Sequence, residues 1–244
     1  MTPAVLEASH VGVTYDTDFR ALTDASFSVQ AGELIAVVGP NGAGKSTLFK
    51  ALAGFVDHEG DVVVHGKHCH HLERQSIAYI PQQTDIDLRF PITVAEVVMA
   101  GRRRFHGRRM RTTQADIAHV MTCLSQVDLG GMENRSLSTL SGGQVQRVML
   151  ARALAQEADV LLLDEALSGV DALHTDELIT LFGNLAATGT SILVSTHDLS
   201  LVRHRFSRCL TVNRRLVGDG HPSVELADNK LEQLFTSVVE EEIQ

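Results

Sequence analysis

A glycine-rich stretch between an apolar run and a helix-forming run restricts this chain more than any other feature. It reads Gly39-Pro40-Asn41-Gly42-Ala43-Gly44-Lys45-Ser46-Thr47. This fits the phosphate-loop pattern G-x-x-x-x-G-K-[ST]. The apolar run Leu34–Val38 before it is typical of a buried parallel strand, and residues 48–53 after it suit a helix that Gly54 ends. A strand, a glycine turn and a helix aim backbone N–H groups and a helix dipole at one point, so the stretch predicts a nucleotide site rather than a chance turn.

Individual residues of this loop have distinct expected roles. Gly42 and Gly44 let the backbone approach a phosphate closely, because they carry no Cβ. Lys45 can place its charge on the β- and γ-phosphates, and Ser46 can offer a hydroxyl to magnesium. The loop by itself predicts nucleotide binding but does not say what the protein does with the nucleotide.

Length, composition, charge and cysteine content exclude several classes of protein. The 244 residues, 44% of them hydrophobic, are enough for a sizeable core, and a net charge of −9 gives no general footprint for nucleic acid. The three cysteines lack metal-ligand spacing and are typical of free thiols in a reducing compartment. We expect no signal peptide and no membrane span, because no stretch approaches the length of a spanning helix. Any role at a membrane is then expected to go through a partner.

The pattern of apolar residues predicts strands and helices along the chain. Strands are expected at residues 12–15, 25–29, 61–65, 77–80, 160–163 and 191–195. Helices are expected from Thr93 to Ala100, from Thr112 or Thr113 to about Gln126, from Ser141 to about Gln156, and from Asp171 to Gly189. Strands that alternate with helices at both ends indicate a parallel α/β core. We therefore expect one domain, with a core at residues 1–87 and 156–244 and a helical insert at about 88–155.

Two carboxylates follow the apolar strand at residues 160–163. In a P-loop ATPase an acid at this place coordinates magnesium directly or through water, and we assign that role to Asp164. Glu165 can face the γ-phosphate if the strand end turns, and can then act as general base for water. The alternative is an acidic strand end at the surface. The phosphate loop upstream favours the functional interpretation.

A serine and two glycines open the helix that follows residue 140. The pentapeptide is Leu140-Ser141-Gly142-Gly143-Gln144. A serine N-cap before two glycines makes a second helix start that attracts phosphate, although an ordinary capped helix is the alternative. The pentapeptide is the signature of the ATP-binding cassette (ABC) family, which this chain resembles over essentially its whole length. Gln146 and Arg147 match the usual continuation.

The resemblance implies a fold and an activity. The implied fold is an α/β P-loop NTPase (RecA-like) core with an N-terminal antiparallel β subdomain and an inserted α-helical subdomain. The implied activity is hydrolysis of ATP to ADP and phosphate, with ATP and Mg²⁺ as cofactors. In the family, ATP held by Lys45 of one subunit is covered by Ser141 and Gly143 of a second copy, arranged head to tail. A homodimer is therefore implied.

The resemblance also implies further site residues. Tyr15 stands where the family places a ring on adenine, and Gln82 after Pro81 resembles the glutamine that reaches magnesium and the attacking water. His197 resembles the histidine at the γ-phosphate, and Asp171 ends a segment that resembles the D-loop. Each of these residues alone would more often be structural. The implied catalytic set is Glu165, His197 and Gln82, and the implied magnesium set is Ser46, Gln82 and Asp164.

One position departs from the family pattern. Members commonly carry proline after the Asp-Glu pair, whereas Ala166 follows here. Alanine removes a backbone restraint next to the expected base. This puts the local loop conformation in question, but not the chemistry.

The stretch from Asp87 through Phe90 and Pro91 to Arg102 resembles the importer branch for divalent metals (manganese, zinc, iron), with chelate importers as near relatives. This implies integral-membrane permease partners, an indirect extracytoplasmic substrate-binding protein, and a peripheral place on the cytoplasmic face of the membrane. The alternative is a soluble ABC ATPase that acts as a scaffold or remodelling factor. A P-loop kinase or GTPase is disfavoured, because neither has a use for residues 140–144.

Two local clusters of side chains have more than one possible interpretation. His65, His68, Cys69, His70 and His71 invite a metal-site interpretation, but in this branch the transported ion passes through the membrane subunits, so we expect no site there. The basic run at residues 102–111 is compatible with a solvated face, with permease or membrane-surface contact, or with nucleic acid. A solvated face is the default, and no nucleic-acid partner is expected.

Overall fold

A mixed sheet forms the centre of the molecule. The computed structural model describes residues 4–15, 19–68, 76–82, 91–105, 112–167 and 172–236. The strands of this sheet are, in spatial order, β10 (Leu216–Gly220), β9 (Arg208–Val212), β3 (Leu34–Val38), β8 (Ser191–Ser195), β7 (Val160–Leu163) and β6 (Ile77–Ile80). The pairs from β9 to β6 are parallel and β10 is antiparallel to β9. The predicted parallel α/β core is confirmed, and β3, β6, β7 and β8 have the predicted bounds.

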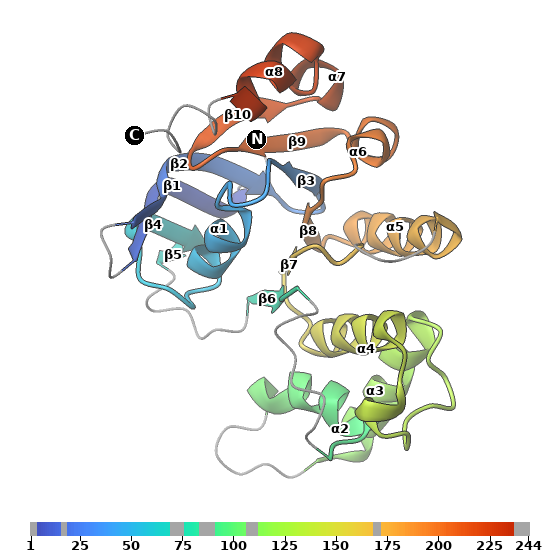
Figure 1. Ribbon diagram of the computed structural model, residues 1–244. Helices are drawn as coiled ribbons and strands as arrows, with labels where there is room; N and C mark the ends of the chain where they lie inside the picture. The colour runs from blue at the N-terminus through green and yellow to red at the C-terminus, as the bar shows by residue number, and fades with distance from the viewer. Residues whose placement is uncertain are drawn as a thin grey trace.

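A second sheet is antiparallel and is built mainly from the N-terminal part of the chain (Figure 1). It contains, in spatial order, β2 (Phe19–Gln30), β1 (Ala4–Tyr15), β4 (Glu59–Val64) and β5 (Lys67–His68). The predicted strands at 12–15 and 25–29 are only the ends of β1 and β2. Both strands are longer than predicted because β1 pairs along its length with β2 on one side and β4 on the other.

Helix α1 (Lys45–Leu52) joins the two sheets through one apolar cluster. Leu48 and Phe49 of α1 lie in the same buried cluster as Leu6 of β1 and Ile35 of β3, and all four side chains are fully buried. The helix was predicted to begin at residue 48, but it begins at Lys45. This packing fixes the phosphate loop between the two sheets.

The middle of the chain forms a group of helices away from the antiparallel sheet (Figure 1). They are α2 (Val94–Met99), η2 (Ala100–Phe105), α3 (Gln114–Gln126), η3 (Leu137–Thr139) and α4 (Gly142–Ala155). Thr93, Thr113 and Ser141 each close a capping box at a helix start. Local sequence predicted all three as caps, with Thr112 as the alternative to Thr113. The exact division into a core and an insert at residues 88–155 stays a prediction.

The C-terminal part contains elements that the sequence pattern did not predict. Besides β9 and β10 these are α6 (Leu199–Arg205), α7 (Pro222–Glu225) and α8 (Asp228–Thr236). Helix α5 (Ala172–Ala187) precedes them as expected, although the predicted cap Asp171 lies outside the described residues. Within the described part of the chain, no helix has the length and apolar character needed to cross a membrane.

Candidate nucleotide-binding site

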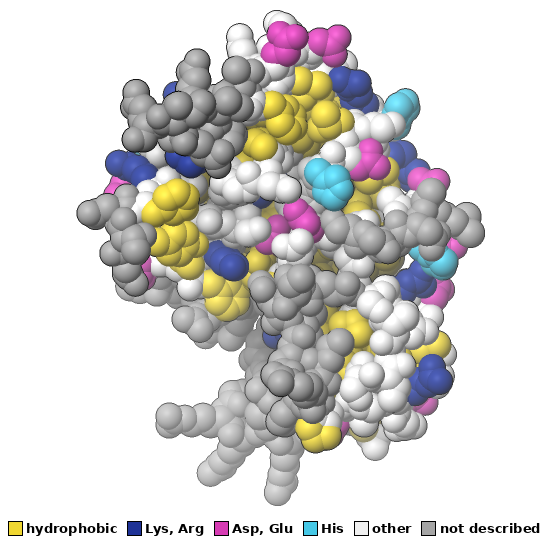
Figure 2. All heavy atoms as spheres, in the orientation of Figure 1, with side chains coloured by type: hydrophobic (Ala, Val, Ile, Leu, Met, Phe, Trp, Pro, Cys, Tyr) yellow, Lys and Arg dark blue, Asp and Glu magenta, His cyan; other side chains and the backbone are white. Residues whose placement is uncertain are grey.

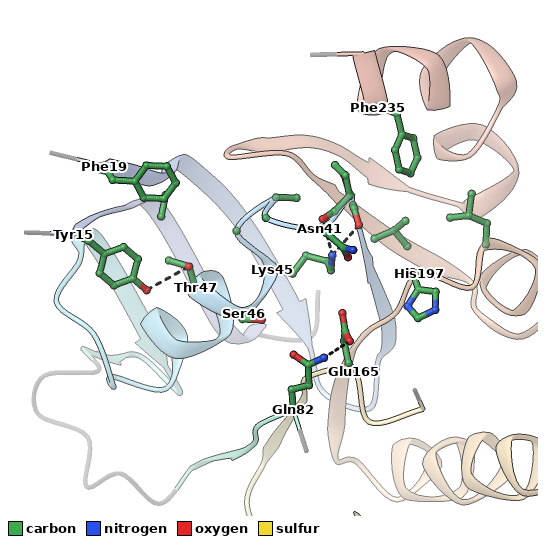
Figure 3. A pocket seen from close by; sticks show the side chains of 18 residues that line it. Tyr15, Phe19, Asn41, Lys45, Ser46, Thr47, Gln82, Glu165, His197 and Phe235 are labelled. Atoms are coloured by element: carbon green, nitrogen blue, oxygen red, sulfur yellow. Dashed lines mark hydrogen bonds between the residues drawn. The ribbon is translucent and has the colours of Figure 1, made fainter. Parts of the chain in front are cut away.

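A cleft of about 820 Å³ opens at the carboxyl end of β3. Acidic and histidine side chains lie close together near the centre of this face in Figure 2. The cleft is lined by the phosphate loop together with residues from both sheets and from the C-terminal part. These are residues 38–47, Tyr15, Phe19, Ala21, Gln82, Glu165, His197, Leu199 and Phe235 (Figure 3). The structure therefore brings together the predicted loop, Tyr15, Gln82, Glu165 and His197.

The phosphate loop is shaped by glycines at points of close approach. Gly44 precedes α1 with a φ of 90°, and a Cβ there would lie 2.6 Å from the carbonyl oxygen of Ala21. A Cβ on Gly39 would lie 2.0 Å from the carbonyl oxygen of Val212. Because α1 begins at Lys45, the residues from Lys45 to Thr47 occupy its first turn. The N–H groups of a first turn have no partner within the helix and can bind phosphate.

Lys45 is buried under the loop that it belongs to. Its side chain is 6% exposed, and Nζ donates to the carbonyl oxygens of Gly39 at 2.8 Å and Pro40 at 2.9 Å. Burial lowers the pKa of Lys45, while the nearby charges of Glu165 and Asp164 act in the opposite direction. Phosphate oxygens would replace the two carbonyl groups as stronger, charged acceptors.

The acid pair after β7 is placed in two different environments. Asp164 is 1% exposed, and its two oxygens accept hydrogen bonds from Ser195 Oγ at 2.7 Å and from the Tyr79 hydroxyl at 3.1 Å. Glu165 lines the cleft, and its Oε2 accepts a hydrogen bond from Gln82 Nε2 at 2.7 Å (Figure 3). The strand end therefore turns, as the assignment of Glu165 to the cleft requires.

The backbone at Glu165 explains how the turn is made. Its φ of 49° lies in the left-handed region, which residues with a Cβ adopt rarely. A proline in the next position would favour extended backbone at Glu165, and Ala166 imposes no such preference. The departure from the family pattern at Ala166 is thus compatible with the conformation found here.

The proposed magnesium set fits the chemistry of that ion. Ser46 offers a hydroxyl, Gln82 an amide oxygen and Asp164 a carboxylate, and Mg²⁺ prefers oxygen ligands. No cluster of three or more His, Cys, Asp or Glu side chains suited to a metal is found among the described residues.

The histidines near β4 and β5 have other partners. His65 Nε2 lies 3.2 Å from Asp159 Oδ2, and His68 Nδ1 lies 3.2 Å from Asp61 Oδ1. The remaining members of that cluster, residues 69–71, lie outside the described residues. Most of the basic run at residues 102–111 also lies outside the described residues. Within its described part, Arg102 Nε lies 3.1 Å from Asp116 Oδ1.

Two aromatic side chains line one end of the cleft (Figure 3). Tyr15 and Phe19 face each other in the register of the β1–β2 hairpin, and both line the cleft. The Tyr15 hydroxyl lies 3.4 Å from Thr47 Oγ1. The Arg214 guanidinium lies 5.5 Å from the centre of the Phe19 ring. Phe19 was missed, because only the hairpin register places it opposite Tyr15.

The signature residues lie apart from this cleft. Ser141, Gly142, Gly143 and Gln144 open α4, and none of them lines the cleft. Ser141 and both glycines are exposed. Gln146 further along α4 donates to the carbonyl oxygen of Ala166, which ties the signature helix to the loop after Glu165. Asp171 lies outside the described residues.

Other contacts of the site had little or no signal in the sequence. Leu199 and Phe235 line the cleft but belong to C-terminal helices that were not predicted. Tyr79 and Ser195 bond to Asp164 from neighbouring strands. Tyr79 precedes Gln82 by three residues and Ser195 precedes His197 by two, and this closeness in sequence is the signal that could have drawn attention to them.

Comparisons with known proteins agree with this geometry. Residues 22–168 match the family described as ABC transporter. The chain is 39% identical over 96% of its length to YfeB of Yersinia pestis, called a chelated iron transport system membrane protein, and covers 80% of that relative. It is 38% identical over 92% of its length to MntA of Synechocystis, called a manganese transport system ATP-binding protein, and covers 87% of it. It also resembles the solved structure of a metal-chelate type ABC transporter in an inward-facing conformation. The TM-score is 0.83 and the identity 27%, with 96% of this chain and 90% of that one covered.

Proposed function

Because this chain belongs to the ABC transporter family and is an ATP hydrolase of that family, we propose that it powers a membrane importer of divalent metal ions or metal chelates. The observation that carries the ATPase part is the cleft that gathers the phosphate loop, Gln82, Glu165 and His197. The metal part is supported by relatives named for manganese, zinc and chelated iron transport.

The proposed roles of the cleft residues follow from their positions. Lys45 and the first-turn N–H groups of α1 bind the β- and γ-phosphates. Tyr15 stacks on adenine. When magnesium is bound, Ser46, Gln82 and Asp164 would hold it, and its charge would neutralise the phosphate oxygens.

Hydrolysis needs a base, a positioned water and a contact to the γ-phosphate. The oxygen of water attacks the γ-phosphorus while the bond to the bridging oxygen of ADP breaks, and Glu165 accepts the proton of the water. The amide of Gln82 orients this water. His197 donates to the γ-phosphate.

The exposed signature residues support a pair of subunits. The cleft has no contribution from Ser141 or Gly143 of its own chain. A second copy placed head to tail would bring these residues onto the phosphates and would complete two sites at once. We propose that the closing and opening of this dimer moves permease subunits at the cytoplasmic face of the membrane. A substrate-binding protein on the other side would deliver the metal.

The second candidate is an ABC ATPase without a transport role. Affinity purification of the tagged chain from detergent-solubilised membranes separates the two. We expect a polytopic membrane protein to co-purify, and cells that lack the chain to accumulate less manganese, zinc or iron. Complementation with the wild type should restore uptake, and complementation with Glu165→Gln should not. Recovery of the chain only in soluble complexes, with unchanged metal content, would contradict the importer.

A further inference from the structure

The carboxylate of Asp164 is held from both strands that flank β7. The order of the sheet places β6 on one side of β7 and β8 on the other. Tyr79 of β6 donates its hydroxyl to Oδ2 at 3.1 Å, and Ser195 at the end of β8 donates Oγ to Oδ1 at 2.7 Å. Each oxygen of this buried side chain therefore has a donor from a different strand.

Ser195 makes a second contact to the acid pair. Its Oγ accepts a hydrogen bond from the backbone N–H of Glu165 at 2.8 Å, and Ser195 itself is 0% exposed. Glu165 has the left-handed φ of 49° that presents its side chain to the cleft. One hydroxyl thus restrains both the orientation of the Asp164 carboxylate and the backbone turn at Glu165.

A buried carboxylate needs hydrogen-bond partners even where it has only a structural role. The hydrogen bonds of Ser195 are therefore compared with those of an equally buried serine that lies away from the acid pair. Ser191 lies at the other end of β8 and is also 0% exposed. Its Oγ donates to the carbonyl oxygen of Gln30 at 2.9 Å and accepts from the N–H of Gly32 at 3.1 Å. The two serines share burial, strand and number of these bonds. They differ in that Ser195 bonds to the acid pair.

We propose that Ser195 and Tyr79 are positioning residues for ATP hydrolysis. They hold the Asp164 carboxylate in the orientation that binds the magnesium ion of the nucleotide. Ser195 in addition holds Glu165 in the turn that faces the cleft. This inference rests on the roles proposed above for Asp164 and Glu165. Neither Ser195 nor Tyr79 gives up or takes up a proton in the reaction.

The test compares Ser195→Ala and Tyr79→Phe with the matched control Ser191→Ala in the full-length chain. The first readout is the Mg²⁺ concentration that gives half of the ATP-dependent rise in melting temperature, which does not require turnover. We expect both variants to raise this concentration by roughly 10- to 100-fold, the usual effect of losing a partner of a metal ligand. Ser195→Ala should also lower kcat at saturating Mg²⁺. Ser191→Ala should change neither quantity more than about twofold, whatever it does to stability, because effects at separate sites are largely independent.

Two results would overturn the inference. One is a wild-type Mg²⁺ dependence in both Ser195→Ala and Tyr79→Phe, and the other is an equal loss in Ser191→Ala. If Ser195→Ala does not fold, Tyr79→Phe decides the Asp164 part, because it removes one hydroxyl from a half-buried ring. Asp164→Asn and Glu165→Gln separate this inference from the proposed function. Wild-type turnover in Asp164→Asn and Glu165→Gln would refute the roles assigned to these two residues. If both variants lose turnover while Ser195→Ala and Tyr79→Phe keep wild-type turnover and Mg²⁺ dependence, only the positioning role is refuted.

Discussion

Gln82 Nε2 donates a hydrogen bond of 2.7 Å to Oε2 of Glu165, and the two residues follow the neighbouring strands β6 and β7. The bond links the residue that we expect to orient water to the residue that we expect to deprotonate it. Oε2 of Glu165 therefore already accepts a hydrogen bond from the side-chain amide of Gln82. During turnover this bond has to open, or Oε1 has to receive the proton.

Glu165→Gln should bind ATP and hydrolyse it very slowly. The amide keeps the size of the side chain but cannot accept a proton from water, so kcat should fall by about 10²- to 10⁴-fold. ATP-loaded protein should then accumulate as a dimer, which size-exclusion chromatography with and without ATP would detect. Glu177→Gln on the surface of α5 is the control. Wild-type turnover in Glu165→Gln would show that another group is the base.

Lys45→Ala should bind ATP much more weakly than the wild type. Nζ is held by two loop carbonyl groups at 2.8 and 2.9 Å and lies at the point toward which the loop directs phosphate. Loss of a charged hydrogen-bond donor should weaken ATP binding by roughly 10- to 100-fold, measurable by isothermal titration calorimetry. Lys50→Ala, in the last turn of the same helix, is the matched control. Unchanged ATP affinity in Lys45→Ala would refute the phosphate site.

Several elements could be predicted because their signals are local. The strands β3 and β7 are uninterrupted apolar runs, and β8 is an apolar run between two serines, as expected when a parallel sheet is covered on both faces. The starts of α2, α3 and α4 depend on side chains that bond to backbone within three residues. The phosphate loop follows such an apolar strand and has a recognisable local pattern, and its residues line the cleft.

The parts of the site and fold that could not be predicted depend on contacts between residues that are distant in the sequence. Tyr79 and Ser195 reach Asp164 from positions 85 and 31 residues away, and only the strand order places them beside it. The length of β1 depends on pairing with β2 and β4, which propensity does not encode. β9 contains Arg208 and Thr211, and β10, at the sheet edge, contains Asp219 and two glycines, so neither is a continuous apolar run.

Stability should fall at alkaline pH because two thiols are buried. Burial raises the pKa of Cys123 from an ordinary value of 9.0 to about 11, and burial together with the nearby carboxylates of Glu225 and Asp219 raises that of Cys209 to about 12. Above pH 9 the unfolded chain loses these protons while the folded chain keeps them. The stabilisation is therefore complete below pH 9 and is lost as the pH rises toward 11 and 12.

Urea unfolding at pH 8 and pH 10 checks this prediction in a Cys69→Ser background. The free energy of unfolding should be lower at pH 10, and the difference should shrink when Cys123 and Cys209 are also replaced by alanine. Both thiols should react with a thiol reagent slowly in buffer and rapidly in urea. A pH dependence that survives the removal of both thiols would assign it to other groups.

Tyr15→Ala and Phe19→Ala should each weaken the binding of ATP more than that of inorganic triphosphate. The two rings face each other across the hairpin and line the end of the cleft away from Glu165 and His197 (Figure 3). A base stacked on one ring gains about 1 kcal/mol or more, so the loss for ATP should be at least about fivefold. Triphosphate has no base, and its affinity should change little. Ile117→Ala is the control, because Ile117 of α3 is an apolar side chain that is 43% exposed and does not line the cleft. If Tyr15→Ala loses affinity for ATP and for triphosphate equally, this tyrosine has a structural role. If Phe19→Ala loses affinity for ATP alone, Phe19 also contacts the base.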